Sequence, residues 1–413
     1  MKKKKGIKKA NSIIAGFLKI FFRPALYLIY RFRFDRSISK HIQRPCIILS
    51  NHQTVIDQFA VSMGFKFAIN YVASDTIFRH GLLSKLMVAL VRPIPFSKGS
   101  SDIIAVKNMM SVIADGGCVA MFPSGNRSYF GKENKIVNGV GKLVKRLNAP
   151  LVLMNLQGGY FTKARWQAKT NRGKMIAKVV KTFQTDELAS MSNEELDTII
   201  QKTLSFNDFE YNQKAQIKFR GKHKAEYLES VLFYCPNCSA PPTKNEWGGG
   251  GGANLRSQGN DFFCQDCQMR VRLNQYGFFE RVENAESIPE TILEWGEMQL
   301  NYIKSFDFSP FTDKPLFVDR EVSFMQAERA KKEHFIGKGD IMLYADRISV
   351  CGNDFLFTDI SFTLQGVRKL TIYKDNEVYA VKVNFRTNLF KYMVCGYHLK
   401  HKLLNTKEEY YGY

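Results

Sequence analysis

The sequence predicts an α/β protein with a mixed, mostly parallel sheet and flanking helices, followed by a small cysteine-containing module and a β-rich C-terminal region. Three observations lead to this prediction. Strand-like apolar runs alternate with helical stretches between residues 45 and 156. Two Cys-x-x-Cys pairs follow at 235–238 and 264–267, and short β-type runs dominate from residue 341 onwards. A chain of 413 residues also exceeds one ordinary hydrophobic core, which agrees with several domains.

The positive charge of the chain is concentrated at its N-terminus. The formal net charge is +22, and residues 1–50 contain 13 Lys or Arg and one Asp, so more than half of the excess lies in this first part. Such an end is attracted to anionic lipid or to nucleic acid, and each basic residue near an anionic membrane contributes roughly 1 kcal/mol. The alternative for residues 1–9 is a disordered, solvated tail.

An apolar stretch over residues 13–30 follows this basic end. Its apolar residues recur at helical spacing, but Lys19, Arg23 and Pro24 interrupt it, and no small-residue cleavage site follows. These interruptions argue against a secretory signal and against a membrane-spanning helix. We predict two short helices, separated at Pro24, that lie in the membrane interface. The alternative is a pair of helices packed on the protein's own core.

Strands and helices then alternate along the first domain. Strand-like runs lie at 46–49, 67–72, 119–122, 151–156 and 174–182, and helical stretches lie at 54–63, 82–91, 103–114, 136–147 and 192–204. The third helix ends at Gly116 and Gly117, and Ser192 with Glu195 forms a capping box at the start of the last one. This alternation predicts a mostly parallel sheet, with active residues where strands end and helices begin.

A histidine and an aspartate lie at one of these junctions. The apolar run 47–50 is followed by Asn51 and His52, and Asp57 follows one turn into the next expected helix. A carboxylate in this position can hold an imidazole in one tautomer while the other ring nitrogen faces a substrate hydroxyl. His52 and Asp57 are therefore the candidate catalytic pair. The alternative is that His52 is a capping or core histidine.

A second polar segment, residues 122–128 with the sequence FPSGNRS, follows another predicted strand. Gly125 allows a sharp backbone turn towards a ligand, and Arg127 can contact a phosphate with two nitrogens. The alternatives are a surface ion pair for Arg127 and ordinary turn or cap roles for Ser124 and Ser128. Together, the two segments predict acyl transfer to a phosphorylated alcohol.

At these residues the chain resembles the glycerolipid acyltransferase family, typified by 1-acylglycerol-3-phosphate acyltransferases. Asn51, His52 and Asp57 match the family motif N-H-x-x-x-x-D, and the resemblance implies that the histidine is the base and the aspartate its partner. Residues 122–128 match the motif F-P-E-G-T-R-S, whose arginine helps to hold the acceptor's phosphate. Residues 94–98 correspond to a second family motif and residues 149–152 to a fourth.

Three positions depart from the family pattern. Ser124 stands where the family usually has Glu, Asn126 replaces Thr, and Lys98 stands where Arg is expected. A lysine keeps the charge but lacks the planar fork of a guanidinium. The predicted substrate-binding residues are Lys98, Ser124, Gly125, Asn126 and Arg127. Because the base pair is retained we expect activity, with an acceptor that can differ from 1-acylglycerol-3-phosphate.

The two Cys-x-x-Cys pairs, Cys235 with Cys238 and Cys264 with Cys267, are separated by 25 residues. Two such pairs arrange four thiolates tetrahedrally around one Zn²⁺, and the strand-like run 269–273 fits a zinc ribbon. Four Cys ligands leave no coordination position for a substrate, so we expect structural Zn²⁺. Iron in a rubredoxin-like site and four free thiols are the alternatives. The cysteines do not resemble a disulfide framework, which fits a reducing compartment.

These observations divide the chain into five parts. We predict basic membrane-binding helices over 1–40, an acyltransferase domain over 41–225, a zinc ribbon over 226–285, a linker with a helix over 286–335, and a β-rich domain over 336–413. By strand count alone, the last part resembles a pleckstrin-homology domain. It ends in a predicted helix around residues 389–404.

The sequence as a whole predicts a membrane-associated O-acyltransferase. It would transfer a fatty acyl group from acyl-CoA or from acyl carrier protein to the free hydroxyl of a lysophospholipid, with 1-acylglycerol-3-phosphate as the first choice and phosphatidic acid as its product. The expected location is the cytoplasmic face of the membrane, with lipids as partners. No nucleic-acid partner is expected, because no basic-aromatic segment surrounds the cysteines. The alternatives are a catalytically silent lipid-binding relative and an acyltransferase for a different lysolipid.

Overall fold

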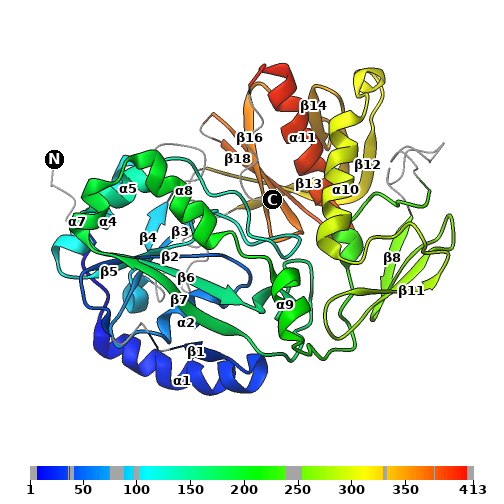
Figure 1. Ribbon diagram of the computed structural model, residues 1–413. Coiled ribbons are helices and arrows are strands. Elements are labelled where there is room, and N and C mark those ends of the chain that lie inside the picture. The colour runs from blue at the N-terminus through cyan, green and yellow to red at the C-terminus, as the bar shows by residue number, and fades with distance from the viewer. Residues whose placement is uncertain are drawn as a thin grey trace. The chain divides into compact units, whose positions relative to one another are not determined.

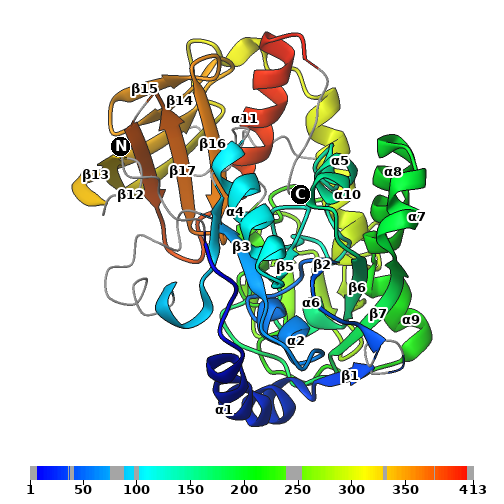
Figure 2. The same cartoon turned by 90° about the vertical axis from the view of Figure 1, so that its left-hand side faces the viewer.

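The computed structural model describes residues 7–35, 37, 41–74, 88–96, 102–238, 254–328, 333–375 and 377–406. These residues form two compact units (Figures 1 and 2). The first unit contains residues up to 164 together with 171–219, and the second contains residues 165–170 together with those from 220 onwards.

A seven-stranded sheet forms the centre of the first unit. Its strands are, in spatial order, β1 (Arg33–Asp35), β7 (Ile176–Phe183), β6 (Leu151–Gln157), β2 (Cys46–Ser50), β5 (Cys118–Met121), β3 (Asn70–Ser74) and β4 (Ile94–Phe96). The five strands from β6 to β4 run parallel, whereas β7 runs antiparallel to β6 and parallel to β1. The predicted α/β class with a mixed, mostly parallel sheet is confirmed.

Helices cover both faces of this sheet. Side chains along a strand alternate between faces, so Ile47 and Leu49 of β2 contribute to one core and Cys46 and Ile48 to the other. The first face is covered by α4 (Ile103–Ala114), α5 (Val140–Leu147), α7 (Thr185–Ser190) and α8 (Asn193–Leu204), and the second by α1 (Ser12–Tyr30) and α2 (Asp57–Ser62) (Figure 1). Because β2 is buried on both faces, its sequence is continuously apolar rather than alternating.

One helix, α1, takes the place of the two short helices that were predicted on either side of Pro24. The Asn11 side chain accepts the backbone N–H of Ile13 at its start, and the helix then runs for 19 residues through Pro24. A proline inside a helix costs about 3 kcal/mol, but Leu26 and Tyr30 beyond it are buried in the core, so packing outweighs that cost. Contrary to the sequence prediction, α1 is long and apolar enough to cross a membrane by length and composition.

The second unit contains two antiparallel sheets. The smaller consists of β11 (Phe279–Glu283), β10 (Arg270–Leu273), β9 (Asp261–Cys264) and β8 (Leu255–Gln258). The larger consists of β15 (Asn353–Leu356), β14 (Arg347–Val350), β13 (His334–Leu343), β12 (Phe317–Glu328), β18 (Glu377–Lys382), β17 (Lys369–Lys374) and β16 (Ile360–Gln365). The predicted C-terminal helix is present as α11 (Leu389–Leu403), which packs against β14, β16 and β17.

The segment 286–335, predicted to be a linker with a helix, contributes more structure than expected. It contains α10 (Ile292–Ser305) and also β12, which lies between β13 and β18 in the larger sheet. The register of β12 with β13 shifts between Asp319 and Val322, and Glu321 there has a φ of 58°. Such a bulge interrupts the alternation of polar and apolar residues by which a strand is recognised in a sequence. The β-rich region therefore begins at Phe317 rather than at residue 336.

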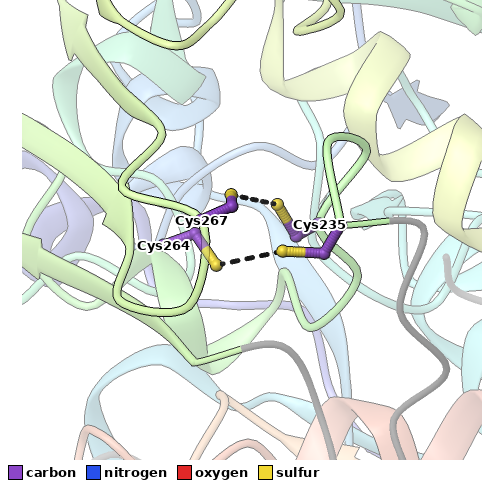
Figure 3. Close-up of side chains that lie close together, drawn as sticks. Cys235, Cys264 and Cys267 are labelled. Atoms are coloured by element: carbon purple, nitrogen blue, oxygen red, sulfur yellow. Dashed lines mark hydrogen bonds between the residues drawn. The ribbon is translucent and has the colours of Figure 1, made fainter.

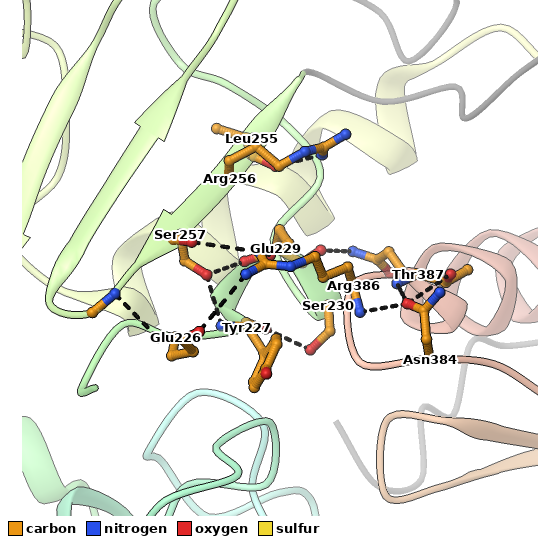
Figure 4. A network of polar contacts seen from close by, with 12 residues as sticks. Glu226, Tyr227, Glu229, Ser230, Leu255, Arg256, Ser257, Asn384, Arg386 and Thr387 are labelled. Carbon is orange, nitrogen blue, oxygen red and sulfur yellow. Dashed lines mark hydrogen bonds and ion pairs between the residues drawn. The ribbon is translucent and has the colours of Figure 1, made fainter. Parts of the chain in front are cut away.

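A polar network around Glu229 joins the small sheet to the segment that precedes α11 (Figure 4). Arg386 Nη1 donates to Glu229 Oε1 at 2.6 Å, the Ser257 hydroxyl donates to Oε2 at 2.5 Å, and Asn388 Nδ2 donates to the Glu229 carbonyl at 2.8 Å. Burial raises the pKa of Glu229, and the Arg386 guanidinium opposes this shift. The predicted zinc ribbon and the β-rich region are thus parts of one unit.

Candidate active site

Two neighbouring parallel strands, β2 and β5, end at the same edge of the first sheet. The segments that follow them, which carry His52 and Phe122, therefore leave the sheet side by side. The two rings stack with their centroids 4.2 Å apart and an angle of 16° between their planes. The parallel pairing of two strands thus brings together the two motifs that the sequence analysis selected.

Asp57 fixes the orientation of the His52 ring. Its Oδ2 lies 2.7 Å from His52 Nδ1 and also accepts the backbone N–H groups of Gln53 and Thr54, at 2.6 and 2.9 Å. With Asp57 ionised, Nδ1 donates its hydrogen, and Nε2 keeps the lone pair that a base needs. The Asp57 side chain is fully buried, whereas that of His52 is 20% exposed. Asp57 therefore holds the buried side of the ring, and the other side remains accessible to a substrate.

Asn51 fixes the end of β2 from which His52 emerges. Its Nδ2 donates to the Leu156 carbonyl at 2.9 Å, and its Oδ1 accepts the Leu156 backbone N–H at 2.7 Å. Asn51 is buried, and both contacts reach β6, the neighbouring strand. The first motif therefore supplies a structural residue as well as the candidate catalytic pair.

The second motif forms a tight turn. Gly125 has a φ of 71°, and a side chain added there would meet nothing within 4 Å, so the backbone conformation rather than lack of space favours glycine. The buried Ser124 hydroxyl donates to the Asn126 carbonyl at 3.2 Å, and Asn134 Nδ2 donates to the same carbonyl at 3.1 Å. These contacts hold the turn that precedes Arg127.

Arg127 brings a positive charge within electrostatic range of the His52–Asp57 pair. Burial lowers the pKa of its guanidinium, and the negative charge of Asp57 raises it. A guanidinium nevertheless stays protonated near neutral pH. Of the predicted substrate-binding residues, Lys98 lies outside the described residues, just beyond β4. Among the predicted substrate-binding residues that the structure describes, Arg127 is therefore the positively charged one.

Two buried carboxyl groups near this pair were not found in the sequence analysis. Glu133 Oε2 accepts the His52 backbone N–H at 2.9 Å, and Asp208 accepts two backbone N–H groups at 2.6 and 3.2 Å. Burial raises the pKa of Glu133 well above its ordinary value and that of Asp208 to about 7, and the charge of Asp57 adds to both shifts. No recognisable motif surrounds Glu133 in the sequence. Asp208 resembles an ordinary acidic residue in the first turn of a helix, here α9 (Asp208–Ala215).

The four cysteines of the two pairs converge in the second unit (Figure 3). Their sulfur atoms all lie within 4.8 Å of one another, with 3.8 Å between those of Cys235 and Cys267 and 3.7 Å between those of Cys238 and Cys264. In a tetrahedral site, Zn–S bonds of about 2.3 Å place the sulfurs about 3.8 Å apart. The donor set and its spacing therefore fit one Zn²⁺.

A comparison with family models gives a match over the part of the chain that contains both motifs, residues 51–57 and 122–128. Residues 31–156, which include His52, Asp57 and Arg127, match the family model described as Acyltransferase. Among solved structures, the crystal structure of the 1-acyl-sn-glycerophosphate (LPA) acyltransferase PlsC from Thermotoga maritima is similar at 17% identity and a TM-score of 0.40, over 46% of this chain and 76% of that one. A comparison with curated proteins gives no match.

The buried Asp208 makes stability depend on pH. Because its pKa is raised from 3.8 to about 7, the folded protein binds a proton that the unfolded chain releases in this window. The free energy of unfolding is therefore expected to fall as pH rises from about 4 to about 7, by up to about 1.4 kcal/mol per pH unit for one group. Asp208→Asn is expected to show a shallower fall. Urea titration at several pH values, monitored by amide hydrogen exchange in β2 and β6, measures how the free energy of unfolding changes with pH in the parent and in the variant. Equal slopes in the two proteins would contradict the assignment.

Proposed function

We propose that the chain is a membrane-associated O-acyltransferase that transfers a fatty acyl group from a thioester donor to the free hydroxyl of a lysophospholipid. The hydrogen bond of 2.7 Å between His52 Nδ1 and Asp57, within the part of the chain that matches the acyltransferase family, is the observation that carries this proposal. The proposed acceptor is 1-acylglycerol-3-phosphate, and the proposed donor is acyl-CoA or acyl carrier protein.

His52 acts as the general base in this reaction. Its Nε2 takes the proton of the acceptor hydroxyl as the oxygen attacks the thioester carbonyl, and Asp57 stabilises the imidazolium that forms. When the tetrahedral intermediate collapses, the C–S bond breaks and the imidazolium returns its proton to the leaving thiolate. The ester and a free thiol are the products, so no covalent enzyme intermediate is needed.

Arg127 supports a phosphorylated acceptor. Its guanidinium can bind two phosphate oxygens at once, and its partly buried position strengthens such a contact relative to one in bulk water. In this turn, Ser124 and Asn126 serve mainly to hold the backbone, as their contacts with each other and with Asn134 indicate. Arg127 therefore has the larger proposed role in acceptor selection.

Helix α1 supports attachment to a membrane. Five of its apolar side chains are more than 60% exposed, namely Ile13, Phe17, Ile20, Phe21 and Leu28. An exposed apolar patch of this kind is typical of a lipid-binding surface. Lys19 Nζ donates to the carbonyls of Phe65 and Phe67, at 2.8 and 2.9 Å, which holds the helix along its own unit. We therefore propose peripheral attachment at the cytoplasmic face, where both candidate donors occur, rather than a spanning helix.

The cysteine cluster is proposed to bind one structural Zn²⁺. Cys235, Cys238, Cys264 and Cys267 supply four thiolates, which complete the tetrahedral coordination of the ion. With all four positions occupied by protein, the ion would have no open site for a substrate. Its contribution is to the folding of the second unit.

The first prediction concerns the base. With labelled acyl thioester and 1-acylglycerol-3-phosphate, His52→Ala is expected to lower kcat/KM by about 10²–10⁴, because general-base assistance is lost. His223→Ala, in which a half-exposed histidine of the second unit is removed, is expected to keep the parent rate. A panel of other lysophospholipids identifies the preferred acceptor. Product formation by His52→Ala at the parent rate refutes the proposed chemistry, and no product with any acceptor favours the silent lipid-binding alternative.

The membrane role of α1 is tested by vesicle sedimentation. Removing two exposed aromatic side chains in Phe17→Ser/Phe21→Ser is expected to weaken binding to anionic vesicles at least about tenfold, because burying each in lipid stabilises binding by roughly 1.5–3 kcal/mol. The control Val282→Ser/Leu356→Ser changes two exposed apolar residues of the second unit and is expected to bind like the parent. Equal binding by the α1 variant would show that another surface attaches the protein.

The metal is tested by elemental analysis of the purified chain. We expect one zinc per chain, and none in Cys264→Ser, which loses one of the four ligands. Because binding of structural zinc contributes roughly 10–16 kcal/mol in small zinc-finger peptides, the variant is expected to lose the fold of the small sheet. Cys395→Ser changes a buried cysteine of α11 outside the cluster and is expected to keep its zinc. Iron in the parent, or no metal, would overturn the assignment.

A further inference from the structure

Glu133 makes a contact with His52 that the reaction described above does not use. Its side chain reaches across 81 positions of the sequence to accept the His52 backbone N–H at 2.9 Å. Glu133 is 5% exposed, and within the described residues its second oxygen, Oε1, has no hydrogen-bond partner. Buried polar groups usually have hydrogen-bond partners, so a buried carboxyl group that binds the backbone N–H of His52 indicates a specific role.

The backbone carbonyl of His52 is held by the same segment. The Ser128 backbone N–H donates to the His52 carbonyl at 2.9 Å, so segment 128–133 binds both the N–H and the C=O of His52. These two contacts fix the backbone of the residue whose ring stacks on Phe122 and bonds to Asp57. The ring position thus depends on the chain to which Glu133 belongs.

That segment is itself firmly braced. The Ser128 hydroxyl donates to the Lys132 carbonyl at 2.6 Å and accepts the Gly131 N–H at 2.8 Å. The Glu133 N–H donates to the Phe206 carbonyl at 2.8 Å, and the Gly131 carbonyl accepts the Asp208 N–H at 2.9 Å. Glu133 therefore extends from a fixed backbone, as a group that sets the position of another must.

We propose that Glu133 is a positioning residue for the acyl-transfer reaction: by accepting the His52 backbone N–H, it places the imidazole between Asp57 and Phe122. This inference rests on the proposed role of His52 as the base. Burial and the charge of Asp57 raise the pKa of Glu133 and favour its protonated form, in which Oε2 still accepts a hydrogen bond. The length of the Glu133 side chain, rather than its charge, then determines the position of His52.

Two conservative variants separate reach from charge. Glu133→Gln keeps the length of the side chain and an oxygen that can accept the His52 N–H, but it has no charge. Glu133→Asp keeps the carboxyl group and moves it away from His52 by one methylene. We expect Glu133→Gln to retain kcat within about threefold and Glu133→Asp to lose about 10–100-fold in kcat with a nearly unchanged KM, because a shift of about 1 Å in a catalytic group costs up to about 100-fold.

A second readout does not depend on activity. The ring Nδ1–H of His52, assigned by its loss in His52→Ala, is followed by ¹H–¹⁵N NMR in the full chain. It is expected to be protected from exchange in the parent and in Glu133→Gln, and to broaden in Glu133→Asp. If the parent transfers no acyl group the proposed function fails, but this signal still tests the positioning role.

Asp197 provides the matched control. Its carboxylate also accepts backbone N–H groups across the first unit, from Gly139 at 3.1 Å and Gly141 at 2.6 Å, without contacting His52. Asp197→Asn is expected to keep both the rate and the His52 signal. The proposal is overturned if Glu133→Asp matches the parent, or if Glu133→Gln loses activity and signal as strongly as Glu133→Asp, because then the carboxyl's charge or proton acts in the reaction.

Discussion

The hydrogen bond between Asp57 and His52 is the constraint from which the rest of the site follows. A carboxylate buried without partners would cost several kcal/mol, and Asp57 offsets much of this cost because its Oδ2 binds one ring N–H and two backbone N–H groups, while its buried Oδ1 has no hydrogen-bond partner among the described residues. The backbone must then turn immediately after β2, so that residues 53 and 54 point their N–H groups at the start of α2. The same turn leaves the far side of the imidazole open to a substrate.

The sheet explains why distant parts of the chain cooperate at this ring. Parallel strands end at a common edge, so the residues after β2 and β5 meet without any special loop. The segment after β5 then does three things in a short length: Phe122 stacks on the ring, Arg127 supplies positive charge, and residues 128–133 bind the His52 backbone. A site built in this way is positioned by the strand register and by backbone hydrogen bonds, and Ser124 and Asn126 take part in the contacts that hold the turn.

Much of this arrangement could be predicted from the sequence because local signals carry it. The continuous apolar run before Asn51 marks a buried parallel strand, and Cys-x-x-Cys spacing marks a four-thiolate cluster. Glu133 and Asp208 were missed because their importance comes from contacts with residues far away in the chain, for which a single sequence holds no signal. β12 was missed because a bulge at Glu321 breaks its alternation, and α1 was divided at Pro24 because a local rule was applied without the packing of Leu26 and Tyr30 beyond it.

The three buried carboxyl groups also determine which charge the reacting atoms experience. Burial and mutual repulsion raise the pKa of Glu133 and of Asp208, which favours their protonated, neutral forms. Asp57 differs from both in its contacts, because its Oδ2 is bound by the His52 ring and by two backbone N–H groups. In the proposed reaction, a proton taken up by His52 is stabilised by the Asp57 carboxylate, whose Oδ2 lies 2.7 Å from the ring Nδ1.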